Sequence, residues 1–150
     1  MGLDMYLRAT KYISSYTEPE TLRAIAKVVE ADKIMNEDTL GASVDITIGY
    51  WRKANAIHDW FMQLTDEDNC QPVYLERQRL VELLNTCSEV SAAKDDNLSA
   101  QLLPTASGFF FGSTEYDEYY YDQVDETIKL IKRVLDNTDE SWSFEYQASW

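Results

Sequence analysis

Hydrophobic and polar residues alternate in three segments of the chain, and a period of two predicts β-strands with one buried face. The first segment is 3–13, which is rich in Tyr, Leu and Ile, the second is 43–48 (SVDITI), and the third is the tail 142–150. We expect Gly49 to close the second strand. The first and last segments lie near the two ends of the chain, so we expect them to pair in one sheet.

Apolar residues recur at steps of three and four in four other segments, which predicts amphipathic helices. These segments are 17–35, 50–64, 73–91 and 114–135. In the first, Thr17 and Glu20 have the spacing of a capping box. In the last, Thr114 and Asp117 are the expected N-terminal caps, and the acidic start and basic end of the segment suit the helix macrodipole.

The second predicted helix contains one inconsistency between pattern and charge. Its apolar stripe runs at helical spacing through Tyr50, Ala54, Ile57, Phe61 and Leu64. Two cations, Arg52 and Lys53, nevertheless fall near its start, where the macrodipole disfavours positive charge. Local conflicts of this kind sometimes mark functional sites, so the segment is a candidate for one.

The remaining segments are predicted to be connections. Residues 36–42 join two elements, the acidic run 65–69 is solvated, and the polar stretch 91–100 is mobile. The run Phe109–Phe111 lies between two glycines and is short and apolar, as in a buried extended segment. No repeat or linker divides the chain. We therefore expect a single α+β domain over 1–150, with about four helices packed on a small, mostly antiparallel sheet that includes both terminal strands.

The composition is that of a folded globule, with 45% hydrophobic and 13% aromatic residues. The two cysteines, Cys70 and Cys87, are too few for a disulfide scaffold, and His58 is the sole histidine. These residues cannot complete a four-ligand zinc site, so we expect reduced thiols, no metal and no cofactor. No secretory signal or membrane span is visible, which favours a cytoplasmic protein without a membrane partner.

Negative charge is the strongest feature of the composition. The formal net charge is -14. Residues 1–65 carry seven basic and nine acidic side chains, whereas residues 66–150 carry six basic and eighteen acidic ones. Such a surface repels phosphate backbones, so direct binding of nucleic acid is not expected. The expected partners are basic proteins, cations or neutral ligands.

A first candidate site lies along the predicted helix that starts at Tyr50. Its side chains offer a stacking ring, a guanidinium fork and two groups that form directed hydrogen bonds. The glycine-flanked turn after Phe111 can bring backbone amides close to a ligand. The candidate ligand-binding residues are Trp51, Arg52, Asn55, His58, Gly112 and Ser113. The alternative is structural: Trp51 and His58 belong to the core, and Arg52 pairs with an acid.

A second candidate site is the segment 107–122, in which tyrosines lie among carboxylates. Tyrosine supplies rigid contact area, and acids steer a basic partner, so the pattern is typical of a protein-recognition surface. The candidate partner-binding residues are Glu115, Tyr116, Asp117, Glu118, Tyr119 and Asp122. The alternative is a solvated acidic helix face with the tyrosines packed beneath it.

Signatures of catalysis are weak. The chain has no G-x-S-x-G, no phosphate-binding loop, no dinucleotide fingerprint and no H-E-x-x-H. We therefore assign no catalytic residues. A small hydrolase or nucleotide-modifying enzyme built on His58, Arg52 and Asp117 remains as a rival class.

Four blocks, MGLDMYL, YWRKANAIHDWF, LLPTASGFFFGSTEYDEYYYD and FEYQASW, together resemble a family of small uncharacterised proteins of bacteriophages and prophages. The resemblance covers nearly the whole chain. It implies a viral origin and an intracellular life in an infected bacterium, and it attaches no reaction to any residue.

These observations favour a non-enzymatic accessory protein that binds a host protein with a basic surface. Its carboxylates would imitate a phosphate array and so block a DNA-binding host enzyme, as in counter-defence. The alternative is a protein that sequesters a small molecule or nucleotide in a pocket around Arg52, Asn55 and His58. Four Trp and ten Tyr exceed what one small core usually hides, so a homodimer is also open.

Overall fold

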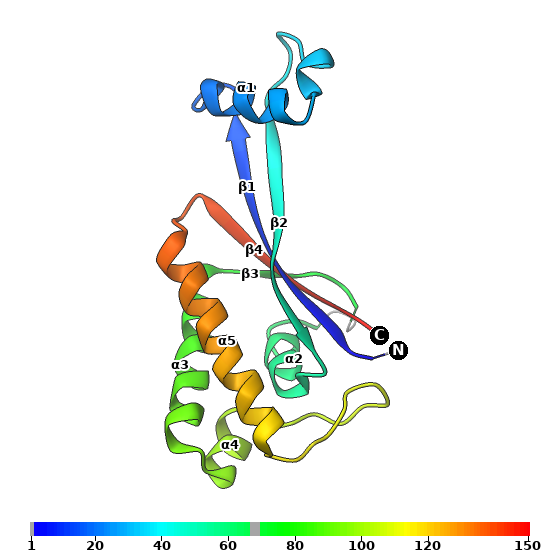
Figure 1. Cartoon of the computed structure of the whole chain (residues 1–150), viewed down its shortest axis with the longest axis vertical. Helices are drawn as coiled ribbons and strands as arrows, with labels where there is room; N and C mark the ends of the chain where they lie inside the picture. Colours follow the sequence, from blue (N-terminus) through cyan, green and yellow to red (C-terminus); the bar gives the residue numbers. More distant parts are fainter. Residues whose placement is uncertain (1, 67–69) are drawn as a thin grey trace.

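The computed structural model describes residues 2–66 and 70–150. The described residues form one four-stranded antiparallel sheet in the order β2-β1-β4-β3 (Figure 1). The strands are β1 (Asp4–Ser14), β2 (Gly41–Arg52), β3 (Val73–Leu75) and β4 (Trp142–Ser149). The helices are α1 (Pro19–Val28), the 3-10 turn η1 (Ala31–Lys33), α2 (Asn55–Met62), α3 (Arg77–Ala93), α4 (Asp96–Leu102) and α5 (Glu118–Asn137).

The two terminal strands are neighbours at the centre of the sheet, as the sequence predicts. Asp4 of β1 lies opposite Ser149 of β4, and the two ends of the chain lie side by side in Figure 1. β1 pairs with β2 along its other edge. The predicted α+β class is confirmed, and the described residues contain five α-helices where about four were expected.

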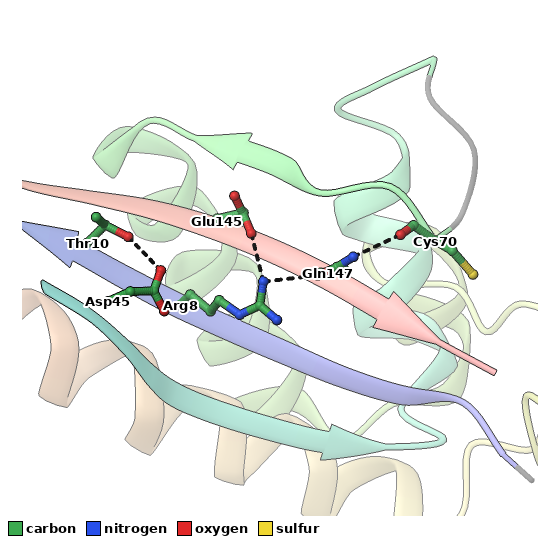
Figure 2. A network of polar contacts seen from close by, with 6 residues as sticks. All are labelled: Arg8, Thr10, Asp45, Cys70, Glu145 and Gln147. Atoms are coloured by element: carbon green, nitrogen blue, oxygen red, sulfur yellow. Dashed lines mark hydrogen bonds and ion pairs between the residues drawn. The ribbon is translucent and has the colours of Figure 1, made fainter. Parts of the chain in front are cut away.

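One face of the sheet carries the core. Alternate residues of β1, including Met5 and Leu7, are fully buried, as is Tyr146 of β4. Helices α2, α3 and α5 cover this face, and Figure 2 views the sheet with helices behind it. The apolar stripe of α5, which includes Val124 and Ile131, packs into the same core.

β1 and β2 extend beyond the rest of the sheet as a two-stranded arm. β4 pairs with β1 only as far as Lys11, so residues 12–43, which we call the arm, leave the body of the molecule and carry α1 and η1 at their far end (Figure 1). Ile13, Leu22 and Ala26 are buried within the arm, apart from the main core cluster.

The boundary between the second strand and the second helix differs from the prediction. β2 continues through Arg52, and α2 begins only at Asn55. Gly49 does not close the strand; it lets β2 approach α5, because a Cβ there would lie 2.5 Å from Leu130 Cδ2. Lys53, with φ of 55°, turns the chain in a left-handed conformation that separates strand from helix.

The first predicted helix is shorter than its apolar pattern. α1 ends at Val28, and Glu30, with φ of 57°, breaks it before η1. The predicted capping box does not form, because Glu18 is the N-cap residue and makes no capping hydrogen bond through its side chain.

Two loop predictions also change. Residues 73–75 pair with β4 as β3, so the third helix starts at Arg77, and the predicted loop 91–100 is largely helical. Lys94 ends α3 in a left-handed conformation, and Asp95 caps α4 by accepting a hydrogen bond of 2.8 Å from the Leu98 amide. Of the predicted loop 65–69, positions 67–69 lie outside the described residues.

Candidate functional site

Asn55, at the start of α2, holds the long loop that precedes α5. Its side-chain amide donates to the carbonyls of Phe111 at 3.0 Å and Ser113 at 2.8 Å, and its oxygen accepts from the Ala106 amide at 3.0 Å. The side chain is 4% exposed. Both of its N–H groups are used within the protein, so Asn55 organises the loop and has little left to offer a ligand.

The three phenylalanines of this loop have different environments, contrary to the predicted buried extended segment. The loop turns at this point, since the Phe111 amide donates to the Gly108 carbonyl. Phe109 is 95% exposed, whereas Phe111 packs edge-on against His58 with ring centroids 5.1 Å apart. Three successive side chains on a turn point in different directions, so one packs inward and another points to solvent.

His58 lies in the core. It is 2% exposed, and its Nδ1 lies 2.6 Å from the hydroxyl oxygen of Tyr146. The rings of Phe111 and Trp150 pack edge-on against it. Burial lowers the pKa of His58 from 6.5 to about 4, so the imidazole is neutral at neutral pH. This environment is that of a structural histidine.

Trp51 and Arg52 point to opposite sides of β2 and do not share one wall with Asn55 and His58, contrary to the prediction. Trp51 is buried, and its indole nitrogen donates to Thr127 Oγ1 of α5 at 2.8 Å. The Arg52 side chain is exposed, and its carbonyl accepts from the Tyr119 hydroxyl at 2.6 Å. The reason is the strand geometry of Gly49 to Arg52, in which successive side chains alternate between faces.

Gly112 and Ser113 do lie beside Asn55. Gly112 has φ of +86° and approaches the side chain of Lys53. A cavity of about 20 Å³ lies here at the start of α2, lined by residues that include Asn55, Ser113 and Asp117. Its volume suits about one water molecule. The cavity is too small for a nucleotide or a similar signal molecule.

A larger open groove of about 470 Å³ runs between β2 and α5. Arg52, Lys129 and Arg133 line it, with Glu126 among them. Arg133 also donates to the Ile48 carbonyl at 3.3 Å, so α5 covers part of the outer edge of β2. Sequence reasoning missed this groove, because its residues come from two elements far apart in the chain.

The tyrosines at the start of α5 mostly fix the fold. The buried Tyr120 donates from its hydroxyl to the Leu103 carbonyl at 2.8 Å, and Tyr116 accepts from the Thr105 amide at 3.3 Å. The Tyr121 hydroxyl donates to Asp96 Oδ1 of α4 at 3.1 Å. Burial raises the pKa of Tyr120. Tyr119 differs from these residues, because 47% of it is exposed.

The carboxylates of this segment point to solvent. Asp117, and not Thr114, caps α5 by accepting a hydrogen bond of 3.0 Å from the Tyr120 amide. Glu115, Glu118 and Asp122 are exposed and, like Asp117, make no ion pair within residues 2–66 and 70–150.

The hydrogen bond between Tyr121 and Asp96 brings α4 next to the carboxylates at the start of α5, and Figure 1 shows α4 beside the start of α5. We call the resulting surface the acidic end. It consists of Asp95, Asp96, Glu115, Asp117, Glu118 and Asp122. Asp95 and Asp96 were absent from the sequence-based candidates, because that segment was predicted to be a loop.

The face of the sheet away from the helices carries a polar network (Figure 2). Arg8 donates from Nη1 to Glu145 at 3.1 Å and to Gln147 at 3.0 Å, which links β1 to β4. Thr10 donates to Asp45 at 3.0 Å, which links β1 to β2. These cross-strand bonds occupy the polar groups with one another, so the network stabilises the sheet and is a weaker candidate for ligand binding.

The cysteines are free thiols. Cys87 is buried on α3, and burial raises its pKa to about 12, whereas Cys70 is exposed. The described residues contain no cluster of three His, Cys, Asp or Glu side chains that could bind a metal ion. None of the helices in the described parts of the chain has the length and apolar character needed to cross a membrane.

No family model, curated protein or solved structure matches the chain. The resemblance to the phage and prophage family therefore stays a prediction. The functional interpretation of the candidate sites therefore depends on their geometry in this structure.

Proposed function

We propose that the protein works by binding another protein through the acidic end. The observation that carries this proposal is that Glu115, Asp117, Glu118 and Asp122 are solvent-exposed and unneutralised by any ion pair among the described residues. Carboxylates that lack a cation of their own are available to one on a partner, and their field speeds the approach of a basic surface. Tyr119 adds a half-exposed ring beside them.

The spacing of the acids supports nucleic-acid mimicry as the form of this binding. α5 carries acids at 118, 122, 125 and 126, of which Glu118 and Asp122 make no ion pair among the described residues, whereas Asp125 pairs with Lys94 and Glu126 with Lys129. With a rise of about 1.5 Å per residue, the four carboxylates span about 12 Å of helix, with a mean spacing of about 4 Å. A DNA strand carries one phosphate per about 3.4 Å. The proposed target is thus a host protein that binds DNA, which the acidic end would occupy in an infected bacterium.

The buried state of His58 supports the non-enzymatic form of the proposal over a hydrolase built on His58, Arg52 and Asp117. A general base needs to reach its substrate, and His58 is 2% exposed behind Phe111 and Trp150. Sequestration of a small ligand is the second candidate. The groove beside Arg52 and Arg133 favours it, since their guanidinium groups suit a carboxylate or phosphate, whereas Lys129 in the same groove is paired with Glu126.

The test is capture from a bacterial lysate on the immobilised full chain, at low and at high salt, with mass spectrometry of bound proteins and small molecules. We expect DNA-binding proteins to be retained at low salt and released at high salt, because exposed charge pairs are screened. A small molecule that stays on the immobilised chain after the bound proteins have been washed off would support sequestration. Absence of any salt-dependent protein would contradict binding through the acidic end.

A further inference from the structure

The end of β2 next to α2 directs a pair of backbone groups away from the sheet. β2 is an edge strand that pairs only with β1, and residues of such a strand alternate between facing the partner strand and facing outward. The Lys53 amide donates to the Leu3 carbonyl at 2.7 Å, so Lys53 faces β1. By alternation Trp51 and Gly49 also face β1. Tyr50, between them, therefore directs its N–H and its carbonyl outward.

Two side-chain hydrogen bonds agree with this direction and leave a gap between them. Arg133 donates to the Ile48 carbonyl at 3.3 Å, and the Tyr119 hydroxyl donates to the Arg52 carbonyl at 2.6 Å, so both carbonyls point away from β1. Tyr50 lies halfway between them, and no side chain of the described residues bonds to its N–H or its carbonyl. A free donor and acceptor on one residue of an edge strand can pair with an added extended segment.

The groove of about 470 Å³ gives such a segment its space. The groove lies along this edge of β2, with Tyr50 on one wall and α5 on the other. Its volume falls within the range of about 300–1,000 Å³ that is usual for ligand sites. The edge from Ile48 to Arg52 extends over four residue steps, or about 14 Å of strand. The groove therefore suits a short extended segment.

Arg133 gives one end of this edge a positive charge. Among the described residues Arg133 makes no ion pair, and its hydrogen bond to Ile48 uses only one of its five N–H groups. The two other charged side chains that α5 contributes to the groove, Lys129 and Glu126, pair with each other at 2.6 Å. The guanidinium of Arg133 is therefore available to a carboxylate, which it can bind through two parallel hydrogen bonds.

The direction of strand pairing decides which end of a peptide meets Arg133. β2 runs from Ile48 towards Arg52, so an antiparallel segment on its outer edge runs the opposite way and ends beside Ile48. A residue of that segment opposite Tyr50 can exchange both backbone hydrogen bonds with it. A carboxylate that follows reaches the level of Arg133 about 7 Å further along. A parallel segment would carry its carboxylate away from Arg133.

We propose that this groove binds the free C-terminal end of an extended peptide, which pairs with β2 at Tyr50 and places its carboxylate on Arg133. The proposal rests on the second candidate function, in which the groove binds an anion, and it names the class of ligand. It uses no residue of the acidic end, so it holds or fails independently of binding there.

The test adds a mixture of N-acetyl tripeptides of uncharged residues to the isotopically labelled full chain and follows the backbone amides by NMR. The same mixture with C-terminal amides is the control. With the free acids, we expect the Tyr50 amide signal to shift and its hydrogen exchange to slow. We expect the amidated mixture to bind about tenfold more weakly or less, because the charge-assisted bonds to Arg133 are lost. Equal binding of the two mixtures, or no change at Tyr50, would overturn the proposal.

Two matched pairs of variants locate the contacts. Arg133→Gln removes the cation, and Lys132→Gln removes the same charge from the exposed neighbouring residue of α5. Tyr50→Pro removes the outward N–H, which an edge strand tolerates, whereas Tyr50→Ala removes the side chain and keeps the N–H. We expect the first variant of each pair to bind the free acids about tenfold more weakly and the second to stay within about twofold of the wild type.

Thermal unfolding of each variant checks the fold. If Tyr50→Pro does not fold, the pair at Arg133 and Lys132 decides, and unchanged binding by Arg133→Gln would overturn the proposal.

Acetate and phosphate separate this inference from the candidate function on which it rests. If either anion shifts the Arg133 side-chain signals while the free-acid peptides leave Tyr50 unchanged, the groove binds anions and the assignment to a peptide end is overturned. If neither the anions nor the peptides bind, the second candidate function fails together with the inference.

Discussion

The hydroxyl of Tyr146 and Nδ1 of His58 form a buried hydrogen bond of 2.6 Å that joins β4 to α2. Phe61 stacks on the Tyr146 ring with centroids 4.1 Å apart, and both Tyr146 and Phe61 are fully buried. Burial raises the pKa of the Tyr146 hydroxyl and lowers that of His58, so both partners are neutral and the bond is polar without charge. This pair helps to fix the helix layer on the sheet.

Removal of the Tyr146 hydroxyl should therefore cost stability. We expect Tyr146→Phe to lower the free energy of unfolding by about 1–3 kcal/mol, because it leaves a buried imidazole nitrogen without its partner. Tyr74→Phe is the control, since Tyr74 is 80% exposed on β3, and we expect a change within about 0.5 kcal/mol. Chemical denaturation measures both. Equal changes in unfolding free energy for the two variants would mean that the hydrogen bond between Tyr146 and His58 does not stabilise the fold.

His58 should also make stability depend on pH. Its pKa falls from 6.5 in the unfolded chain to about 4 in the fold, so the unfolded state binds the extra proton between these values. The free energy of unfolding therefore has its full value above about pH 6.5. It decreases as the pH falls towards 4, by up to about 3 kcal/mol, because the unfolded chain takes up a proton that buried His58 does not.

The comparison that isolates this effect is His58→Gln, which cannot titrate. The wild-type chain should lose its stability advantage over His58→Gln as the pH falls from 7 to 4, in denaturation curves recorded at each pH. A difference that stays constant over this range would show that His58 does not titrate as its burial requires.

Asn55 should control the order of the loop before α5. Asn55→Ala removes three hydrogen bonds, so we expect a loss of about 2–4 kcal/mol in unfolding free energy. The Ala106 amide, which donates to Asn55, should exchange its hydrogen faster in the variant. Asn85→Ala, at an exposed position of α3, is the control and should change neither quantity. Unchanged exchange at Ala106 would contradict the role given to Asn55.

Substitutions in the run Phe109–Phe111 should differ in their effect on stability according to how deeply each ring is buried. Phe111→Ala removes a ring that contacts both His58 and Trp150, and we expect it to cost about 1–3 kcal/mol. Phe109→Ala, at a residue that is 95% exposed, should stay within about 0.5 kcal/mol. Thermal or chemical unfolding of the two variants gives the comparison, and a larger loss for Phe109 would contradict the described packing.

Alternation was enough to predict the two terminal strands. The buried face expected of 43–48 was wrong, since Val44 and Ile48 are only partly buried and Ile46 is 45% exposed. Segments 3–13 and 142–150 each have one face that must be buried, and this requirement fixes which side chains point inward. The pairing of the terminal strands, which was expected from their places near the two ends of the chain, is confirmed. The long last helix was also predictable, because apolar residues recur at helical spacing through Tyr120, Val124, Ile128, Ile131 and Leu135.

The candidate pocket could not be predicted correctly, because residues 49–52 fit two periods. Tyr50 has helical spacing to Ala54, yet it also alternates with Gly49 and Trp51 as strand residues do. The cations Arg52 and Lys53 oppose a helix dipole at that position, which was the available signal that the helix starts later. The groove beside α5 and the contribution of α4 to the acidic end depend on tertiary contacts that no local pattern reports.

If the carboxylates of the acidic end bind the partner, removal of their charges should abolish binding. The variant Glu115→Gln, Glu118→Gln, Asp122→Asn removes three charges there and leaves the cap at Asp117. Its matched control, Glu76→Gln, Asp136→Asn, Glu140→Gln, removes three exposed charges near the other end of α5.

The measurement is the amount of each salt-sensitive protein that the immobilised wild-type chain and the two variants retain from the same lysate at low salt. We expect the control to retain the same proteins as the wild type and the acidic-end variant to lose them. Equal retention by both variants, or equal loss from both, would contradict it.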